Sequence, residues 1–493
     1  MFLPGCATLP PPQPKAAAHA LADSSSTALG RLVTGAAPGP RVSGFRLLSS
    51  GEDALGSLAA LADNAQRTLD LQYYLIRSDE SSRALMRRVR AAADRGVRVR
   101  LLLDDLNTAG QDQGLMRLTA HSNIEVRLYN PFPAGRFSTI SRILASITDI
   151  SRINHRMHNK MFVADNALAI TGGRNLGDAY FVQSKDSNFL DIDLIVAGPA
   201  VRALSATFDR FWNDPLAYPA AAVASAPSPA SAASAPGLAA SAPAAPIAVT
   251  PLAQELKAGS LKLVWAPATV LADRPSKLQS GGEPTDREAI ADDVDGVIQS
   301  ARQELILISP YFVPGERGMA LFKGLRDRGV KVRVMTNSLA TTDAPAVHIG
   351  YARYRADLLG MGVELHELRP KIGAHSANIG SFGSSHASLH AKVVVVDRQT
   401  ALVGSMNLDP RSAKLNSEMG VLVRSPEIAQ QLGRLFDDVS KGCYHLSLGE
   451  GQRVQWRTTP PDPALEGQTE PEASAWLKFG LKVLSPFAPE EML

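Results

Sequence analysis

Short apolar runs alternate with longer amphipathic stretches along most of the chain. Residues 69–74 and 305–312 are apolar runs that end in aromatic side chains, a pattern typical of buried strands. An amphipathic stretch follows the first run and places arginines opposite an apolar helical face. That face comprises Leu85, Met86, Val89, Ala92 and Ala93. Strands followed by helices predict an α/β fold.

The second half of the chain repeats the first. Residues 94–99 match residues 327–332, and each segment carries a glycine that suits the end of a helix before a strand. Residues 124–128 and 363–368 both alternate like half-buried strands. The matching apolar runs and helix ends lie 233–236 residues apart, close to the offset of the other repeated segments. This constant offset indicates an internal duplication, and it predicts a pseudo-dimer of two α/β lobes.

Composition divides the chain into segments. Residues 220–245 are almost wholly Ala, Pro and Ser, which predicts a flexible spacer. Residues 7–40 are similarly rich in these types and predict no fixed structure. The resulting division has five parts: a disordered segment (1–40), a first lobe (41–218), a linker (219–248), a second lobe (249–450) and a C-terminal tail (451–493).

The overall charge and hydrophobicity are those of an ordinary globular protein. Hydrophobic residues make up 45% and charged residues 20% of the 493 positions. The net charge of +3 is too weak to argue for a nucleic-acid partner. The sequence has no uninterrupted apolar run of about 18 residues, so we expect no transmembrane helix.

The two cysteines cannot form a disulfide framework. Cys443 is expected to be an ordinary thiol. Cys6 lies between Leu3-Pro4-Gly5 and Ala7, which resembles the lipobox of bacterial lipoproteins, although the apolar segment that should precede it is missing. Cys6 is therefore a candidate for lipidation, and a chance match is the alternative.

One motif occurs twice with identical internal spacing. The first copy combines His158, Lys160, Asp165 and Asn175, and the second combines His390, Lys392, Asp397 and Asn407. Histidine and lysine two residues apart on a strand would direct both side chains to one face. The asparagine is expected to return after a turn on the next strand.

The paired motif favours phosphodiester chemistry. A buried structural histidine is the alternative for one copy, but two accidental copies that both include lysine are hard to reconcile with the rarity of buried lysine. A metal site is also disfavoured, because protonated lysine cannot be a ligand. Lysines and asparagines suit a phosphate, while one imidazole attacks phosphorus and the other protonates the leaving alkoxide. This chemistry requires no metal or other cofactor.

The paired His-x-Lys-x4-Asp motifs resemble those of the phospholipase D superfamily. Residues 71–74, 91–105, 156–160 and 172–181 are similar to bacterial cardiolipin synthases of the type without transmembrane helices. The resemblance covers roughly residues 45–450. It implies two phospholipase D-like lobes, each a mixed β-sheet flanked by helices.

The resemblance also implies roles for the motif residues. One histidine is the nucleophile, which we assign to His158 with His390 as the acid, although the sequence leaves this order open. Lys160, Lys392, Asn175 and Asn407 are expected to hold the phosphate. The motif aspartates, Asp165 and Asp397, are usually supporting residues.

Carboxylates that orient the histidines are expected further downstream. Glu418 fits that position in the second half, and Asp191 is the better candidate in the first half, ahead of Asp193. A solvated acid at a strand edge is the alternative for Asp191. The halves also differ, because Ser405 in the second half corresponds to Gly173 in the first.

The expected reaction is phosphatidyl transfer between phospholipids, with cardiolipin made from phosphatidylglycerol and a second phospholipid. The alternatives are a phospholipase D hydrolase that releases phosphatidic acid and, less favoured, a nuclease of the same superfamily. We expect phospholipid substrates, a membrane surface and no nucleic acid as partners. Protein partners stay open, and the expected location is a bacterial membrane, peripheral or lipid-anchored.

Three further features lie outside the motifs. His155 and Arg156 could contact a phosphate head group or lie in a solvated loop, and Asp104 and Asp105 are expected to be loop or cap residues. The C-terminal residues 474–487 form a candidate amphipathic helix, with Trp476, Leu477, Leu481 and Leu484 near one face and lysines on another. That helix could lie on a membrane or pack on the protein's own core.

Overall fold

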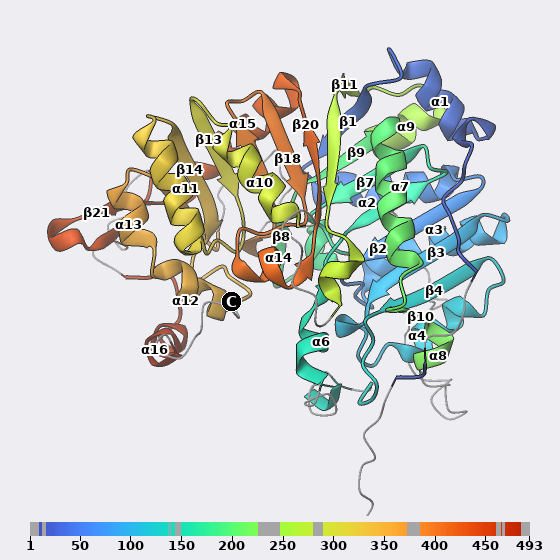
Figure 1. The fold of residues 1–493 in the computed structure, drawn as a ribbon, viewed down its shortest axis with the longest axis horizontal. Coiled ribbons are helices and arrows are strands. Elements are labelled where there is room, and N and C mark those ends of the chain that lie inside the picture. Colours follow the sequence, from blue (N-terminus) through green and yellow to red (C-terminus); the bar gives the residue numbers. More distant parts are fainter. Residues whose placement is uncertain are drawn as a thin grey trace, which may run out of the picture.

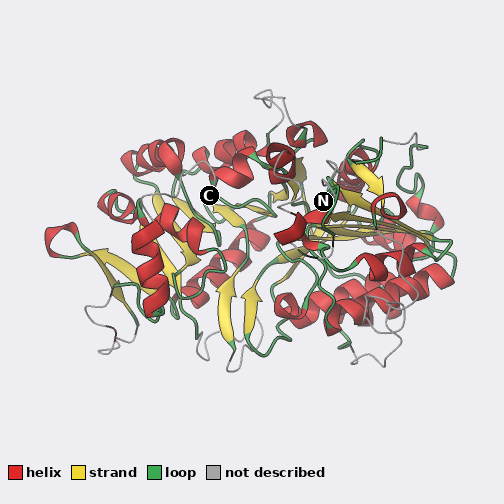
Figure 2. Cartoon of the chain, turned by 90° about the horizontal axis from the view of Figure 1, so that it is seen from below, coloured by secondary structure: helices red, strands yellow, loops and turns green. Residues whose placement is uncertain are grey.

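The chain folds into two lobes that lie side by side (Figure 1). The computed structural model describes most of the sequence, in the following ranges: 9–11, 16–136, 138, 140–142, 149–224, 247–279, 289–371, 385–459, 465 and 469–484. Cys6 and most of the predicted linker lie outside these residues. Each lobe has a central sheet with helices on both sides, as the view from below also shows (Figure 2).

Within the described residues, the first lobe contains a nine-stranded mixed sheet. Strands β2, β3 and β4 are mutually parallel, and β6 pairs antiparallel with β2. In spatial order the strands are β10 (Ala217–Pro219), β4 (Ile124–Tyr129), β3 (Arg98–Asp104), β2 (Thr68–Tyr73), β6 (Met161–Ala164), β7 (Leu168–Gly172), β9 (Asp193–Ala197), β1 (Ser43–Leu48) and β11 (Val264–Ala266).

The second lobe repeats this arrangement in the part of the chain that the structure covers. Strands β13, β14 and β15 are parallel, and β17 pairs antiparallel with β13, as β6 does with β2. In spatial order the strands are β22 (Val454–Arg457), β21 (Tyr444–Leu448), β15 (Glu364–Leu368), β14 (Lys331–Asn337), β13 (Glu304–Ile308), β17 (Val393–Val396), β18 (Thr400–Gly404), β20 (Met419–Val423) and β12 (Ala268–Ala272). The predicted pair of mixed α/β sheets is confirmed.

The helices begin and end where local sequence signals place them. Ser50, Asp79 and Ser425 each cap a helix by accepting a backbone N–H, and the glycines after α3 and α11 have positive φ. The helices are α1 (Ala28–Ala36), α2 (Gly51–Asn64), α3 (Glu80–Asp94), α4 (Asp112–Thr119), α6 (Ile150–Asn154), α7 (Pro199–Trp212), α8 (Ala220–Val223), α9 (Pro251–Lys257), α10 (Ile290–Gln299), α11 (Gly315–Asp327), α12 (Pro345–Ala352), α13 (Arg355–Gly360), α14 (Pro410–Lys414), α15 (Pro426–Ser440) and α16 (Ala475–Leu484). The predicted apolar face of α3 is buried.

The two lobes share a continuous apolar core. One cluster of buried side chains includes Phe208 and Trp212 of α7 together with Phe436 of α15 and Val421 of β20. Apolar surface buried between the lobes stabilises their association in proportion to its area. The lobes therefore form one body, as the predicted pseudo-dimer requires.

The lobe boundaries differ from those that the composition predicted. Residues 251–266 belong to the first lobe, because α9 packs on α2 and β11 pairs with β1. The second lobe begins at β12 and extends past residue 450, since β22 continues its sheet to Arg457. Strand pairing between distant segments decided these boundaries, and composition does not report it.

Part of the predicted disordered segment is ordered. Helix α1 lies within residues 1–40 and buries Leu29 and Val33 against the first lobe. Just before it, the amide of Ala18 donates to Asn213, and Arg100 donates to the carbonyl of Ala18. These long-range contacts explain why an Ala- and Ser-rich stretch adopts one conformation.

None of the helices in the described ranges combines the length and the apolar character that crossing a membrane requires.

Candidate active site

Two short parallel ladders connect the lobes at their interface. Strand β5 (Arg156–Met157) of the first lobe pairs with β19 (Asn416–Ser417) of the second. Strand β8 (Ser187–Leu190) of the first lobe pairs with β16 (His386–Leu389) of the second. Each ladder ends directly before one motif histidine on one strand and one buried carboxylate on the other. The two histidine–carboxylate pairs are therefore aligned by backbone hydrogen bonds.

The histidines pair with carboxylates of the opposite lobe. Nδ1 of His158 lies 2.9 Å from Oε2 of Glu418, and Nδ1 of His390 lies 2.6 Å from Oδ2 of Asp191. The backbone amide of His158 donates to Ser417, and that of His390 donates to Leu190. A carboxylate accepts from Nδ1, which leaves Nε2 of each imidazole available for chemistry.

The structure thus brings Asp191 and Glu418 to the histidines, as the sequence predicted. Both carboxyl groups are fully buried, so the alternative of a solvated acid is wrong for Asp191. Asp193 instead forms an ion pair with Arg174 at 3.0 Å. The sequence did not indicate that each carboxylate would serve the histidine of the other lobe.

The predicted strand across each His-x-Lys pair is wrong. Residues 158–160 connect β5 to β6, and residues 390–392 connect β16 to β17, so each motif lies where the chain passes from the ladder into the main sheet. The Lys160 ammonium group donates to the carbonyl of His158 at 2.7 Å, and Lys392 donates to that of His390. This bend brings each buried lysine close to its own histidine.

The motif aspartates have a different role. Asp165 accepts backbone N–H groups of residues 66–68, and Asp397 accepts those of residues 302–304. Five residues separate Asp165 from Lys160, which corresponds to about 16 Å along a strand. The structure therefore does not bring Asp165 and Asp397 to the histidines. They hold the start of a neighbouring strand at the other end of the sheet.

The asparagines follow the strands on which the sequence predicted them, so the predicted position on a strand is wrong. Asn175 follows the end of β7 and donates to the hydroxyl of Tyr180 at 3.1 Å. Asn407 follows the end of β18, and its backbone N–H donates to the hydroxyl of Ser412. Among the described residues, the side-chain oxygens of Asn175 and Asn407 are buried without a hydrogen-bond partner. An unpaired buried amide oxygen can accept a hydrogen bond from a donor group of a ligand.

The difference between Gly173 and Ser405 has a steric explanation. The Ser405 hydroxyl donates to Glu418, and Ser412 donates to the other carboxylate oxygen at 2.9 Å. In the first lobe a Cβ at position 173 would lie 2.1 Å from Oδ1 of Asp191. The shorter aspartate therefore requires glycine, whereas the longer glutamate leaves room for a serine.

Burial and charge make the two carboxylates unequal. Burial raises the pKa of Glu418 to about 7, although Lys160 and the hydroxyl of Ser405 act in the opposite direction. Burial acts on Asp191 as well, but the charges of His390 and Lys392 outweigh it and lower its pKa. Asp191 is therefore the more firmly ionised partner.

The histidines and lysines are also perturbed. Burial and the charges of Lys160 and Lys392 lower the pKa of His158 well below its usual range, and burial lowers that of His390. Burial lowers the pKa of Lys160 to about 7 and also lowers the pKa of Lys392. A pocket with several crowded cationic groups is suited to an anion, because a bound phosphate would relieve their mutual repulsion.

Comparison with known proteins places this site in a family. The family described as "Cardiolipin synthase, PLD-like domain" matches residues 58–212 and 295–439, which contain both motifs. The chain belongs to this family of phospholipase D-like proteins. The prediction of a phospholipase D-type phosphatidyltransferase of the cardiolipin synthase kind is confirmed.

Relatives match over nearly the whole chain. Cardiolipin synthase C of Escherichia coli is 37% identical over 464 residues, which cover 92% of this chain and 97% of the relative. A cardiolipin synthase of Geobacillus kaustophilus is 26% identical and covers 83% of this chain and 68% of its own. A phosphatidylserine synthase of Haemophilus influenzae has the same fold, with a TM-score of 0.58, 14% identity and coverage of 91% of this chain and 95% of its own.

In this site of the cardiolipin synthase family, aromatic rings contact both histidines. Tyr74 meets His158 edge-on with ring centroids 5.0 Å apart, and Tyr180 meets His390 in the same way at 5.2 Å. Phe189 also contacts the His390 ring. The sequence predicted Tyr74 only as the aromatic end of a strand, and its contact with His158 depends on the tertiary fold.

Asp104 is a site-supporting residue that the sequence did not single out for that role. It caps the residues that follow β3, as predicted, but it also accepts the backbone N–H of Met157 at 2.9 Å. Arg156 is buried and lies 3.4 Å from Asp104, so the interpretation as a solvated loop is wrong for this residue. Burial raises the pKa of Asp104 to about 6.

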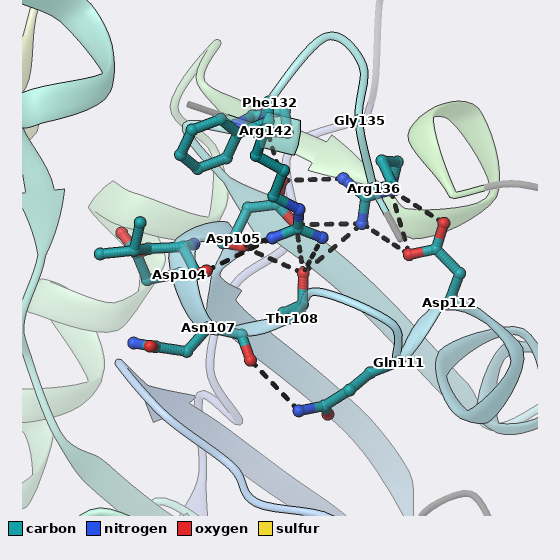
Figure 3. A network of polar contacts seen from close by, with 12 residues as sticks. Asp104, Asp105, Asn107, Thr108, Gln111, Asp112, Phe132, Gly135, Arg136 and Arg142 are labelled. Atoms are coloured by element: carbon teal, nitrogen blue, oxygen red, sulfur yellow. Dashed lines mark hydrogen bonds and ion pairs between the residues drawn. The ribbon is translucent and has the colours of Figure 1, made fainter. Parts of the chain in front are cut away.

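The neighbouring Asp105 holds the segment that precedes α6. The guanidinium groups of Arg136 and Arg142 converge on it (Figure 3). Its carboxylate also accepts the amide of Phe132, and Arg136 reaches Asp112 in addition. This network connects the end of β3 to the segment leading to β5, and therefore to the position of His158.

A second buried ion pair supports Glu418. Lys277 lies 2.8 Å from Asp273 and donates to the carbonyl of Ser412. Asp273 in turn accepts the backbone amide of Glu418 at 2.8 Å. In the sequence, this pair is visible only as an aspartate and a lysine four residues apart. Pairs with this spacing are common on solvated helices, so the spacing does not indicate a buried site.

Proposed function

We propose that this chain transfers a phosphatidyl group from phosphatidylglycerol to a second phospholipid through a phosphohistidine at His158, and that the product is cardiolipin. The observation that carries the proposal is the crossed arrangement of two histidine–carboxylate pairs, each contributed by both lobes, with two buried lysines beside them. The relatives that cover the chain support the lipid class of the substrate.

In the first step Nε2 of His158 attacks phosphorus, and a nitrogen–phosphorus bond forms. The bond between phosphorus and the oxygen of the departing glycerol breaks, and His390 gives this oxygen a proton. Glu418 accepts from Nδ1 of the attacking imidazole, which leaves the lone pair on Nε2. Asp191 accepts from Nδ1 of the proton donor, so the proton that is transferred lies on Nε2.

The electrostatics of the two pairs support this order of roles. The pKa of His158 is lowered well below its usual range by burial and by both lysines, so its imidazole is neutral and nucleophilic. Burial lowers the pKa of His390 as well, but the contact with the more firmly ionised Asp191 at 2.6 Å opposes this effect and favours the protonated imidazole. The asymmetry favours His158 as the nucleophile and His390 as the acid.

The lysines and asparagines of the two motifs hold the phosphate in this proposal. Lys160 and Lys392 supply positive charge in a buried site, where it acts more strongly than in water. Asn175 and Asn407 supply side-chain NH2 groups as hydrogen-bond donors, and that of Asn175 also donates to the hydroxyl of Tyr180. These groups stabilise the charge that develops on the oxygens of the phosphoryl group.

In the second step a hydroxyl of another phospholipid attacks the phosphohistidine. His390, now neutral, accepts the hydroxyl proton, and the nitrogen–phosphorus bond to His158 breaks. With phosphatidylglycerol as donor and acceptor, the balance is two phosphatidylglycerol molecules to one cardiolipin and one glycerol. Water as the acceptor would release phosphatidic acid instead.

The proposed substrates place the protein at a membrane surface. The lipobox-like setting of Cys6 supports an N-terminal lipid anchor, and a peripheral association without an anchor is the alternative. Mass spectrometry of Cys6 in protein purified from bacterial membranes tests this part, because a lipidated N-terminus has a mass that an unmodified chain lacks.

Product analysis tests the reaction. Purified protein and its His158→Ala and His390→Ala variants are incubated with phosphatidylglycerol, and the lipids are identified by mass spectrometry. Cardiolipin from the unmodified protein alone is the expected result. Phosphatidic acid alone would replace the transferase proposal with a hydrolase, and the absence of any lipid product would reject the lipid substrate.

A substrate with a good leaving group separates the roles of the histidines. Phosphatidyl-p-nitrophenol releases a phenolate that needs no protonation, so His390→Ala should still release it in a single burst while His158→Ala should not. Rapid quenching and peptide mass spectrometry should then find the phosphatidyl adduct on His158. An adduct on His390 would reverse the assignment.

A further inference from the structure

The C-terminal helix α16 has an apolar face that the rest of the protein does not cover. Trp476, Phe479 and Val483 are 82%, 60% and 48% exposed, and their spacing of three and four residues places them on one stripe. Of the five large apolar side chains that the described residues leave exposed, three lie on this helix. The other members of the predicted face, Leu481 and Leu484, have side chains that lie outside the described residues.

The side of α16 next to this stripe faces the second lobe. Trp476, Leu477 and Gly480 border an apolar cavity of about 220 Å³ that Leu339 and Ile349 line from the protein side. Trp476 therefore lies where the cavity-facing side and the outward stripe meet. Helix α16 contacts α12 (Figure 1, lower left). The helix is thus apolar on two sides, one directed to the protein and one directed outward.

Ion pairs before the helix hold it in this orientation. Glu470 pairs with Arg355 and lies 3.3 Å from His348 of α12. Glu472 lies 3.1 Å from Arg369 and accepts from Tyr444. A free C-terminal tail would not need these partly buried contacts, so the outward direction of the apolar stripe is a defined feature of the fold.

The helix also lies close to the catalytic edge of the second lobe. Asn337, at the end of β14, bonds to both backbone groups of Leu389, the residue before His390. Two residues further along the chain, Leu339 borders the cavity beneath α16. In Figure 1, α12 lies between α16 at the lower left and α14 near the middle, and α14 carries Ser412, a partner of Glu418.

The charge of the helix matches an anionic surface. Residues 475–484 contain two lysines, Lys478 and Lys482, and no acidic residue. Tryptophan favours the boundary between water and lipid, and lysine beside exposed apolar groups is typical of helices that lie in that boundary.

We infer that the outward stripe of α16, Trp476, Phe479 and Val483, docks on the surface of an anionic phospholipid bilayer and holds the active-site edge against it. This inference rests on the proposed function, because an enzyme that draws phospholipids from a bilayer needs a fixed orientation on it. Docking buries the stripe in the headgroup region, while Lys478 contacts anionic headgroups.

Vesicle binding tests the inference directly. The full chain and the triple variant Trp476→Ser, Phe479→Ser, Val483→Ser are sedimented with vesicles of phosphatidylglycerol and phosphatidylcholine. We expect the variant to bind at least about tenfold more weakly, because three large apolar groups no longer leave water. Val249→Ser is the matched control, since Val249 is 73% exposed on the first lobe and should not affect binding. Equal binding of the triple variant and the unmodified chain would overturn the inference.

Fluorescence gives a second, independent readout. Brominated phospholipids quench tryptophans that enter the bilayer, so they should quench the unmodified chain but not Trp476→Phe, which keeps an aromatic ring at the same position. Equal quenching of both proteins, or of neither, would contradict docking through this stripe.

Turnover separates this inference from the proposed function. The triple variant should lose turnover on vesicles but keep it on detergent-dispersed phosphatidylglycerol, because its active site is unchanged. If the unmodified protein makes no lipid product in either system, the proposed function fails, and vesicle binding still decides whether α16 docks. Sedimentation without lipid tests whether a second copy of the chain, and not a bilayer, covers the stripe. If the unmodified chain is a dimer, the triple variant is a monomer and vesicle binding is unchanged, the inference is overturned.

Discussion

The carboxylate of Glu418 lies 2.9 Å from Nδ1 of His158, although 260 residues separate the two along the chain. Asp191 and His390 form the reciprocal pair at 2.6 Å. Neither lobe alone contains a complete histidine–carboxylate pair. The duplication therefore did not create two independent sites but one composite site at the interface.

Removing the charge of either orienting carboxylate should slow turnover. Glu418→Gln and Asp191→Asn keep the size of each side chain but no longer select the imidazole tautomer that exposes Nε2. We expect kcat to fall by about 10²- to 10⁴-fold with little change in KM. Steady-state kinetics on detergent-dispersed phosphatidylglycerol measure this, and a fall confined to KM would contradict the orienting role.

The motif aspartates provide the matched comparison. Asp165→Asn weakens the acceptor for three backbone N–H groups, so we expect a loss of about 1–2 kcal/mol in the free energy of unfolding. Its kcat, measured well below the melting temperature, should stay close to that of the unmodified protein. Urea unfolding and kinetics on the same sample check both parts, and a loss of kcat as large as that of Asp191→Asn would contradict this role.

A methyl group at position 173 should disturb the first-lobe carboxylate. The added Cβ of Gly173→Ala would meet Oδ1 of Asp191 at 2.1 Å, so Asp191 must move away from His390. We expect kcat to decrease by at least about tenfold, as for other displaced supporting residues. Gly296→Ala in α10 is the control, because its Cβ would meet no described atom within 4 Å. Equal activity of both variants would reject the steric explanation.

The pH profile should depend on Ser405. Its hydroxyl donates to Glu418 and opposes the burial that raises the pKa of this carboxyl to about 7. Loss of the donor in Ser405→Ala disfavours the ionised form, so the pKa rises further. Because orientation of His158 requires the carboxylate, the acidic limb of the kcat profile should move to higher pH.

The control for this shift is Ser205→Ala, since Ser205 is buried and its hydroxyl has no hydrogen-bond partner among the described residues. Its profile should coincide with that of the unmodified protein. An acidic limb that stays in place in Ser405→Ala would show that another group controls the profile.

Local patterns in the sequence determined the fold class and the chemical groups of the site. The apolar runs at residues 69–74 and 305–312 became β2 and β13, and the apolar face that includes Leu85 and Val89 became the buried side of α3. The two motifs, at identical spacing, predicted a histidine pair with two lysines. These features depend on residues close together in the sequence, where periodicity and spacing carry the information.

Tertiary structure alone decided how these groups combine. The crossed pairs depend on the register of β5 with β19 and of β8 with β16, which join segments about 200 to 260 residues apart. Long-range pairing also assigned residues 251–266 to the first lobe and brought Asp165 to the backbone of Thr68. Such contacts arise when segments that are distant in the sequence bury surface and form hydrogen bonds against each other. Local sequence patterns therefore do not specify them.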